Sequence, residues 1–147
     1  MSGYAGGRVQ RRNLLPPTAI SAATIVTQTE NASVARGLRL YVYCTNVTQG
    51  AGTDSITLMA VPPDGGPPIA MAGITGSRIL STTGGSRFCI DFYPGQPQPG
   101  YAATGVTVAA AATYATVCLT VPLKYCVQIV LGTGDSATVA IDSEILP

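Results

Sequence analysis

The chain has 147 residues, of which 10% are charged and 46% are hydrophobic, and its formal net charge is +1. This length predicts one domain with a substantial core, and the near-zero charge excludes a general field that attracts nucleic acid or an anionic membrane. The sequence contains no apolar run of about 20 residues, so no membrane-spanning helix is predicted. Because a free monomer usually has more surface charge for solubility, the low charged fraction favours a subunit of a larger assembly.

The first segment, residues 1–17, is predicted to be an extended N-terminal arm that precedes a single β-sandwich domain at 18–147. The arm ends at Pro16-Pro17, which disfavours helix and favours extended backbone. It contains three arginines and no acidic residue: Arg8, Arg11 and Arg12. From Glu30 onward the chain has five basic and seven acidic residues, so the positive charge is concentrated in the arm. We expect the arm either to be a solvated tail or to dock on an acidic neighbour.

The rest of the chain alternates hydrophobic and polar residues with a period of two, which is typical of half-buried β-strands. No amphipathic helix of ordinary length competes with this pattern. The predicted strands are Thr24–Thr27, Leu38–Cys44, Ser55–Val61, Ile69–Ile74, Arg87–Tyr93, Leu123–Leu131 and Ala137–Ile141. Short strands separated by regular turn signals predict an all-β fold, an antiparallel β-sandwich of jelly-roll or immunoglobulin-like type.

Glycine and proline mark the turns between these strands. Pro62–Pro68 cannot continue a strand ladder, and Gly132–Ser136 is predicted to be a hairpin turn. In Leu123–Leu131, every second residue from Leu123 onward is expected to face the core. The conformation of Val106–Thr120 is undecided between extended chain and one helical turn. Its run of alanines favours a helical turn, but the threonine, valine and glycine on both sides favour extended chain.

The four cysteines match no metal or redox motif. They are Cys44, Cys89, Cys118 and Cys126, and the sequence contains no histidine that could complete a mixed zinc site. The start of the sequence lacks the pattern of a secretory signal, which predicts synthesis in the cytoplasm, where thiols stay reduced. We therefore expect the four cysteines to be small buried hydrophobic residues. We expect the protein to bind no metal and no cofactor.

The residue types that most enzyme sites need are also missing. Without histidine, no Ser-His-Asp or Cys-His nucleophilic site can form. The single lysine, Lys124, is predicted to face away from the core and into solvent. Asp142 and Glu144 share one face of the last strand, as a glycosidase pair would. Because the chain has few polar groups that could position a sugar, an ordinary exposed strand face explains them better. The sequence predicts a protein that is not an enzyme.

One strand presents a candidate contact patch. Arg39, Tyr41 and Tyr43 alternate with the core residues of Leu38–Cys44 and therefore share the outward face. Aromatic and arginine side chains suit contacts with protein or with a glycan. The candidate partner-binding residues are Arg8, Arg11, Arg12, Arg39, Tyr41 and Tyr43.

Several short motifs together resemble a small β-sandwich domain of virion structural proteins of tailed phages. The motifs are Gly52–Leu58, the turn Phe92-Tyr93-Pro94-Gly95, the strand Val121–Val130 and the closing strand Ala140–Leu146. The resemblance covers roughly residues 36–147 of the chain. It implies a structural virion protein, most simply a capsid decoration or cement protein on the capsid surface. Its implied partners are the major capsid protein and further copies of itself, as a trimer at threefold sites, with no membrane and no specific nucleic acid.

Three other functions remain open. A neck, collar or tail subunit keeps the virion but changes the location. A carbohydrate-binding module would use Tyr41, Tyr43 and the loops near Tyr93. The coat protein of a small RNA virus also combines a basic arm with a β-domain, but three arginines neutralise few phosphates.

Overall fold

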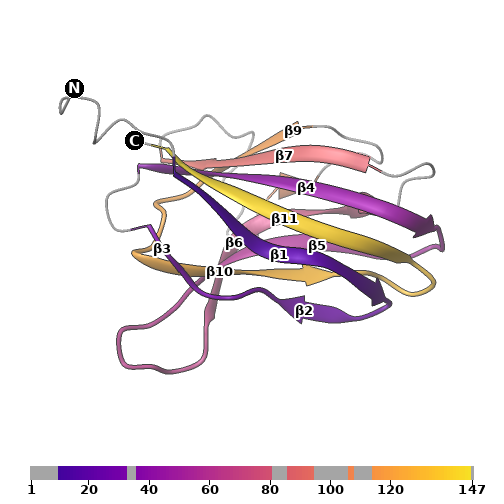
Figure 1. The fold of residues 1–147 in the computed structure, drawn as a ribbon, viewed down its shortest axis with the longest axis horizontal. Helices are drawn as coiled ribbons and strands as arrows, with labels where there is room; N and C mark the ends of the chain where they lie inside the picture. The colour runs from indigo at the N-terminus through magenta and orange to yellow at the C-terminus, as the bar shows by residue number, and fades with distance from the viewer. Residues whose placement is uncertain (1–9, 33–35, 81–85, 95–105, 108–113, 147) are drawn as a thin grey trace.

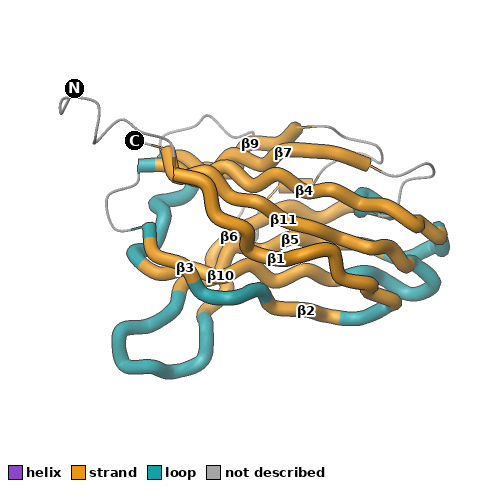
Figure 2. Tube along the Cα trace, in the orientation of Figure 1, coloured by secondary structure: helices purple, strands orange, loops and turns teal. Residues whose placement is uncertain are grey.

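The structure, a computed structural model of the chain, describes residues 10–32, 36–80, 86–94, 106–107 and 114–146. These residues form an all-β sandwich of two packed sheets whose strands are mostly antiparallel (Figure 1). Strands and loops account for the whole described chain (Figure 2), and no helix in these ranges is long and apolar enough to cross a membrane. The predicted β-sandwich is confirmed.

The first sheet, sheet A, contains the strands at the two ends of the described chain. Its order is β1 (Gln10–Ser21), β11 (Ser136–Leu146), β4 (Gly37–Thr48), β7 (Ser86–Tyr93) and β9 (Tyr114–Cys118). Neighbouring strands are antiparallel except β7 and β9, which are parallel. The C-terminal strand therefore lies between the first strand and β4.

The second sheet, sheet B, is built around β10. Its order is β2 (Thr24–Val26), β10 (Lys124–Val130), β5 (Thr53–Ala60), β6 (Ile69–Ser77) and β8 (Val106–Thr107), and β3 (Glu30–Asn31) also pairs with β10. The last pair, β6 with β8, is parallel. The sequence leaves Val106–Thr120 undecided between extended chain and one helical turn. This region contains β8 and β9, while its alanine run, 109–112, lies outside the described residues.

The boundary predicted at residue 17 falls inside β1. Residues 10–17 are extended as expected, but they pair with β11 instead of preceding the sandwich. Pro16 and Pro17 are tolerated because β1 is the edge strand of sheet A and its register shifts between Leu15 and Thr18. Leu14 and Leu15 are buried in the core, so this part of the arm belongs to the domain.

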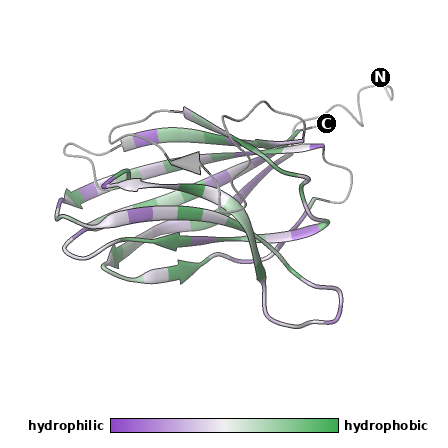
Figure 3. Ribbon diagram, turned by 180° about the vertical axis from the view of Figure 1, so that it is seen from behind, coloured by the Kyte–Doolittle hydropathy of each residue, from purple (hydrophilic) through white to green (hydrophobic). Residues whose placement is uncertain are grey.

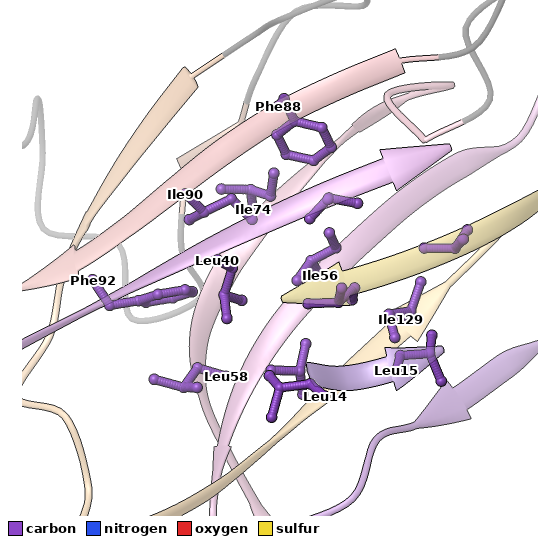
Figure 4. Close-up of a cluster of buried hydrophobic side chains, with 14 of the residues drawn as sticks. Leu14, Leu15, Leu40, Ile56, Leu58, Ile74, Phe88, Ile90, Phe92 and Ile129 are labelled. Atoms are coloured by element: carbon purple, nitrogen blue, oxygen red, sulfur yellow. The ribbon is translucent and has the colours of Figure 1, made fainter. Parts of the chain in front are cut away.

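The core lies between the sheets, where the period of two directs alternate side chains. Leu38, Leu40, Val42 and Cys44 are buried as predicted. Figure 4 shows residues of both sheets meeting there, with Leu40 and Phe92 from sheet A and Ile56 and Leu58 from sheet B. Hydrophobic and hydrophilic residues succeed one another along the strands (Figure 3), which is the pattern that the sequence predicts for a sandwich.

One predicted core residue lies outside. Leu123 is 68% exposed, because β10 begins only at Lys124 and Leu123 precedes the ladder. The other residues of its predicted stripe are buried: Tyr125, Val127, Ile129 and Leu131. The prediction for Leu123 was therefore wrong, and its exposure leaves an apolar side chain at the surface.

Gly73 marks a close approach of two strands. It lies on β6 opposite Thr57 of β5, beside a register shift, and a Cβ at this position would collide with the backbone of Ile56 and Thr57. We expect Gly73→Ala to lower the free energy of unfolding by about 1 to 2 kcal/mol, since a paired backbone cannot move aside as a side chain can. Urea denaturation measures this. The control Ala70→Val, on the exposed part of β6, should change the value by less than about 0.5 kcal/mol, and equal losses would contradict the prediction.

Candidate functional site

The outer face of sheet A presents a row of alternating charges. The strand register places Arg11 of β1 beside Glu144 of β11, Glu144 beside Arg39 of β4, and Arg39 beside Asp91 of β7. We call these residues the charge row. Opposite charges on neighbouring strands stabilise each other, so the row crosses the sheet as a continuous set of favourable contacts.

The Arg39–Asp91 pair is the best-ordered part of the charge row. Nε of Arg39 donates to Oδ1 of Asp91 over 2.7 Å, and Nη2 donates to Oδ2 over 2.9 Å. Such bidentate pairs fix geometry as well as charge. Tyr114 of β9 adds a hydrogen bond from its hydroxyl to Oδ2 of Asp91 over 2.9 Å. Asp91 is only 8% exposed, so three strands meet at one nearly buried carboxylate.

The outer pair of the row is looser. Nε of Arg11 lies 3.1 Å from Oε1 of Glu144. Glu144 is buried, whereas the Arg11 side chain is 79% exposed. Because the arginine is largely in solvent, a pair of this kind contributes little to stability. The Arg11 guanidinium therefore remains accessible to a partner.

The Arg39–Asp91 pair stays charged near neutral pH. Burial by itself would raise the pKa of Asp91, but the hydrogen bonds from Arg39 and Tyr114 outweigh it and hold that pKa below its usual range. The bond to Asp91 raises the pKa of Arg39. Burial, followed by the negative charge of Asp91, raises the pKa of the Cys89 thiol to about 11. Cys89 therefore stays protonated and weakly reactive at neutral pH.

Two tyrosines stand beside the charge row. Tyr41 and Tyr43 are half-buried and line two shallow hollows of about 210 and 340 Å³. Arg11, Asp142 and Glu144 complete the first hollow, and Arg87, Phe88 and Cys89 complete the second. The guanidinium carbon of Arg87 lies 5.0 Å from the centroid of the Tyr43 ring, which is the range of a cation–π contact. The surface is thus aromatic, charged and only slightly concave.

The structure brings together most of the candidate residues. Arg11, Arg39, Tyr41 and Tyr43 lie on this one face, within the charge row or beside it. Arg12 is placed elsewhere, because it alternates with Arg11 along β1 and its Nε lies 3.8 Å from Oε2 of Glu30. Arg8 lies outside the described residues.

Three residues of this face were not predicted as part of the patch: Asp91, Glu144 and Tyr114. Asp91 and Glu144 each stand at an outward position of an alternating strand, which is a signal that the sequence contains. The missing information was which strands are neighbours, and this depends on the topology of the sheet. Tyr114 reaches Asp91 because β9 is the neighbour of β7 in the sheet.

The predicted carboxylate pair has structural partners. Asp142 and Glu144 share the outer face of β11, as expected, but Oδ1 of Asp142 accepts a hydrogen bond from Nδ2 of Asn13 over 2.8 Å. Glu144 is paired with Arg11. In the part of the chain that the structure describes, no group of three or more histidine, cysteine or acidic side chains could hold a metal ion.

None of the four cysteines, all of which lie in the described residues, forms a disulfide. Cys44 and Cys126 are buried as predicted, and Cys89 is intermediate. Cys118 is exposed, which contradicts the prediction of a buried residue, because it ends β9 at the edge of sheet A.

A second, apolar surface lies at one corner of the sandwich. The loop between β5 and β6 projects from the body there (Figure 1). A hollow of about 650 Å³ lies between this loop and the start of β10. Its lining includes the exposed side chains of Ile69 and Leu123, together with Pro62 and Pro63. Exposed apolar clusters of this kind are common at protein contacts.

No family model, no curated protein and no solved structure matches this chain.

Proposed function

We propose that the protein is a structural component of a tailed-phage virion, a capsid decoration or cement protein that binds the major capsid protein through the outer face of sheet A. The main support is the charge row with Tyr41 and Tyr43 beside it. Tyrosine and arginine are enriched at the energetic centres of protein interfaces. Because ion pairs already hold Arg39 and Asp91 in place, little conformational entropy is lost when a partner binds.

Two further observations support this proposal. The sequence motifs around Phe92-Tyr93-Pro94-Gly95 resemble those of phage virion domains. The exposed apolar corner around Leu123 and Ile69 suits contact with additional protein. The proposed partners are accordingly the major capsid protein and further copies of the chain, in a homo-oligomer such as a trimer.

Rebinding to stripped phage heads tests the proposal. Wild-type protein added to heads that lack it should occupy symmetry positions over the whole shell and raise the melting temperature of the heads, because it binds the assembled state. Tyr41→Ala should weaken binding about tenfold or more. The control Thr57→Ala, on the outer face of sheet B, should bind as wild type. No binding to heads would refute the proposal, and a single ring at the portal would favour a neck or tail subunit.

A carbohydrate-binding module is the second candidate, since Tyr41 lies in one hollow with Arg11, Asp142 and Glu144. An aromatic ring beside polar groups is suited to a sugar. The Arg87 contact, however, covers part of the Tyr43 ring. A glycan array with Tyr41→Ala as the control variant distinguishes the two functions. Glycan binding that this substitution abolishes would favour the module, and an array without binding would exclude it.

A further inference from the structure

Two carboxyl groups are buried at one end of the sandwich. Asp54 lies near the start of β5, and Asp135 lies in the turn that precedes β11. Both residues have an exposed fraction of 0%. Asp135 directly precedes β11, whereas Glu144 of the charge row lies near the other end of that strand. The two aspartates therefore belong to a separate part of the molecule.

These carboxyl groups hold the backbone of several loops. Oδ1 of Asp54 accepts the N–H of Gly132 over 3.1 Å, and its Oδ2 accepts the N–H of Leu80 over 2.9 Å. Oδ1 of Asp135 accepts the N–H of Gly50 over 2.6 Å. The loops after β4, β6 and β10 are therefore all attached to the pair.

The end of the sandwich where these loops meet is also closely packed and locally strained. Ala22 and Arg78 have φ values of 43° and 55°, in the left-handed region that is unfavourable for residues with a Cβ. Their N–H groups donate to the carbonyl oxygens of Asp135 and Gly52, respectively. Gly52 and Gly132 approach so closely that a Cβ on either would collide with the backbone of the other. The hydrogen bonds of the two aspartates help to hold this arrangement.

The charges of the pair are not compensated by a buried base. The described segments that meet here contain one other charged residue, Arg78, whose side chain is exposed. Among the described residues, Oδ2 of Asp135 has no hydrogen-bond partner. Burial, to which the adjacent Asp135 carboxyl adds, raises the pKa of Asp54 to about 6, although the N–H groups of Leu80 and Gly132 oppose the shift. Two carboxylates in one buried site cannot both ionise without a large cost.

We propose that Asp54 and Asp135 share one proton and form a pH-dependent clasp on the loops at this end of the sandwich. The O–H of one carboxyl group donates to the other, and the shared proton supplies the donor that Oδ2 of Asp135 lacks. Release of this proton to water leaves two negative charges in contact, and their repulsion loosens the loops. This clasp is independent of the proposed binding to capsids.

The direction of the pH effect follows from proton linkage. Because the pKa of Asp54 is higher in the folded chain than its ordinary value of 3.8, the folded state binds more protons between about pH 4 and pH 6. The contribution of Asp54 to stability is complete below this window and is lost as the pH rises through about 6. Asp91, whose pKa is lowered, changes stability only in more acidic solution.

Thermal unfolding and amide hydrogen exchange from pH 5 to pH 7.5 test the clasp. In the wild type, we expect the melting temperature to fall with rising pH. We also expect the protection factors of the Gly50, Leu80 and Gly132 amides, which are corrected for the intrinsic rise of exchange with pH, to fall. Asp54→Asn, which resembles the protonated acid, should make the profile flat. Asp64→Asn, in the exposed turn between β5 and β6, should keep the wild-type slope.

Three results would overturn the clasp. The first is a wild-type melting temperature that is constant or rises over this range, and the second is an Asp54→Asn variant that keeps the wild-type slope. The third is stabilisation of the wild type by millimolar calcium at pH 7.5 that Asp54→Asn abolishes, because a cation would then occupy the site of the proton. If Asp54→Asn does not fold, an NMR titration of the wild-type amides of Gly50 and Gly132 decides. A midpoint near pH 6 supports the clasp, and its absence overturns it.

Discussion

Phe92→Ala is expected to lower the free energy of unfolding by about 4 kcal/mol, which is typical when a large side chain is removed from a core. Phe92 is fully buried between the two sheets (Figure 4). It lies on β7 between Leu38 of β4 and Val117 of β9. Strands paired on both sides cannot collapse into the space that the ring leaves, so the cavity persists. Denaturation in guanidinium chloride, with the midpoint and slope fitted separately, measures the loss.

The neighbouring residue provides a matched control for Phe92. Tyr93 is only half-buried, and the guanidinium carbon of Arg36 lies 5.8 Å from the centroid of its ring. Tyr93→Ala should therefore cost about 1 kcal/mol. If both variants lose the same free energy, the alternation along β7 does not determine which residues form the core, and the prediction fails.

Arg39→Met is expected to lower the free energy of unfolding by about 2 to 3 kcal/mol at pH 7. The substitution removes the cation and both of its hydrogen bonds to Asp91, and it leaves a nearly buried carboxylate with fewer donors. Removing one partner of a buried pair usually costs about 3 to 5 kcal/mol, and the partial exposure of Arg39 places this site below that range. Denaturation curves at several pH values measure the effect.

The pH dependence separates this ion pair from ordinary packing. The pKa of Asp91 is lowered in the folded wild type, so its contribution to stability is present above the usual aspartate pKa and is lost as the pH falls through the lowered value. The difference between wild type and Arg39→Met should therefore shrink in acid. Arg87→Met, which loses mainly the contact with the Tyr43 ring, should cost about 1 kcal/mol or less at every pH. A cost for Arg39→Met that stays constant down to pH 2 would contradict the prediction.

Local patterns in the sequence were sufficient for the fold class and for much of the core. Alternation alone identified Leu38, Leu40 and Val42 as inward residues, since direction along a strand depends only on the period of two. It also placed Tyr41 and Tyr43 on one outward face. The same reasoning failed at Leu123, where the strand begins one residue later than the pattern suggests.

Contacts between distant segments could not be predicted in this way. The charge row exists because β11 lies between β1 and β4, and no local pattern contains that order. Pro16 and Pro17 favoured an arm outside the domain, since the sequence does not reveal that β1 is an edge strand. The contact of Asp54 with Asp135 likewise depends on the pairing of β5 with β10.

The position of β11 has a consequence for how the protein folds. Residues 136–146 lie between β1 and β4, so sheet A stays divided in two until this strand is inserted. Until then, Leu14 and Leu15 of β1 lack their final neighbours. Because sheet A is completed by pairing between segments that are far apart in the sequence, we expect it to form slowly. During that delay the partly folded chain exposes apolar surface that favours aggregation.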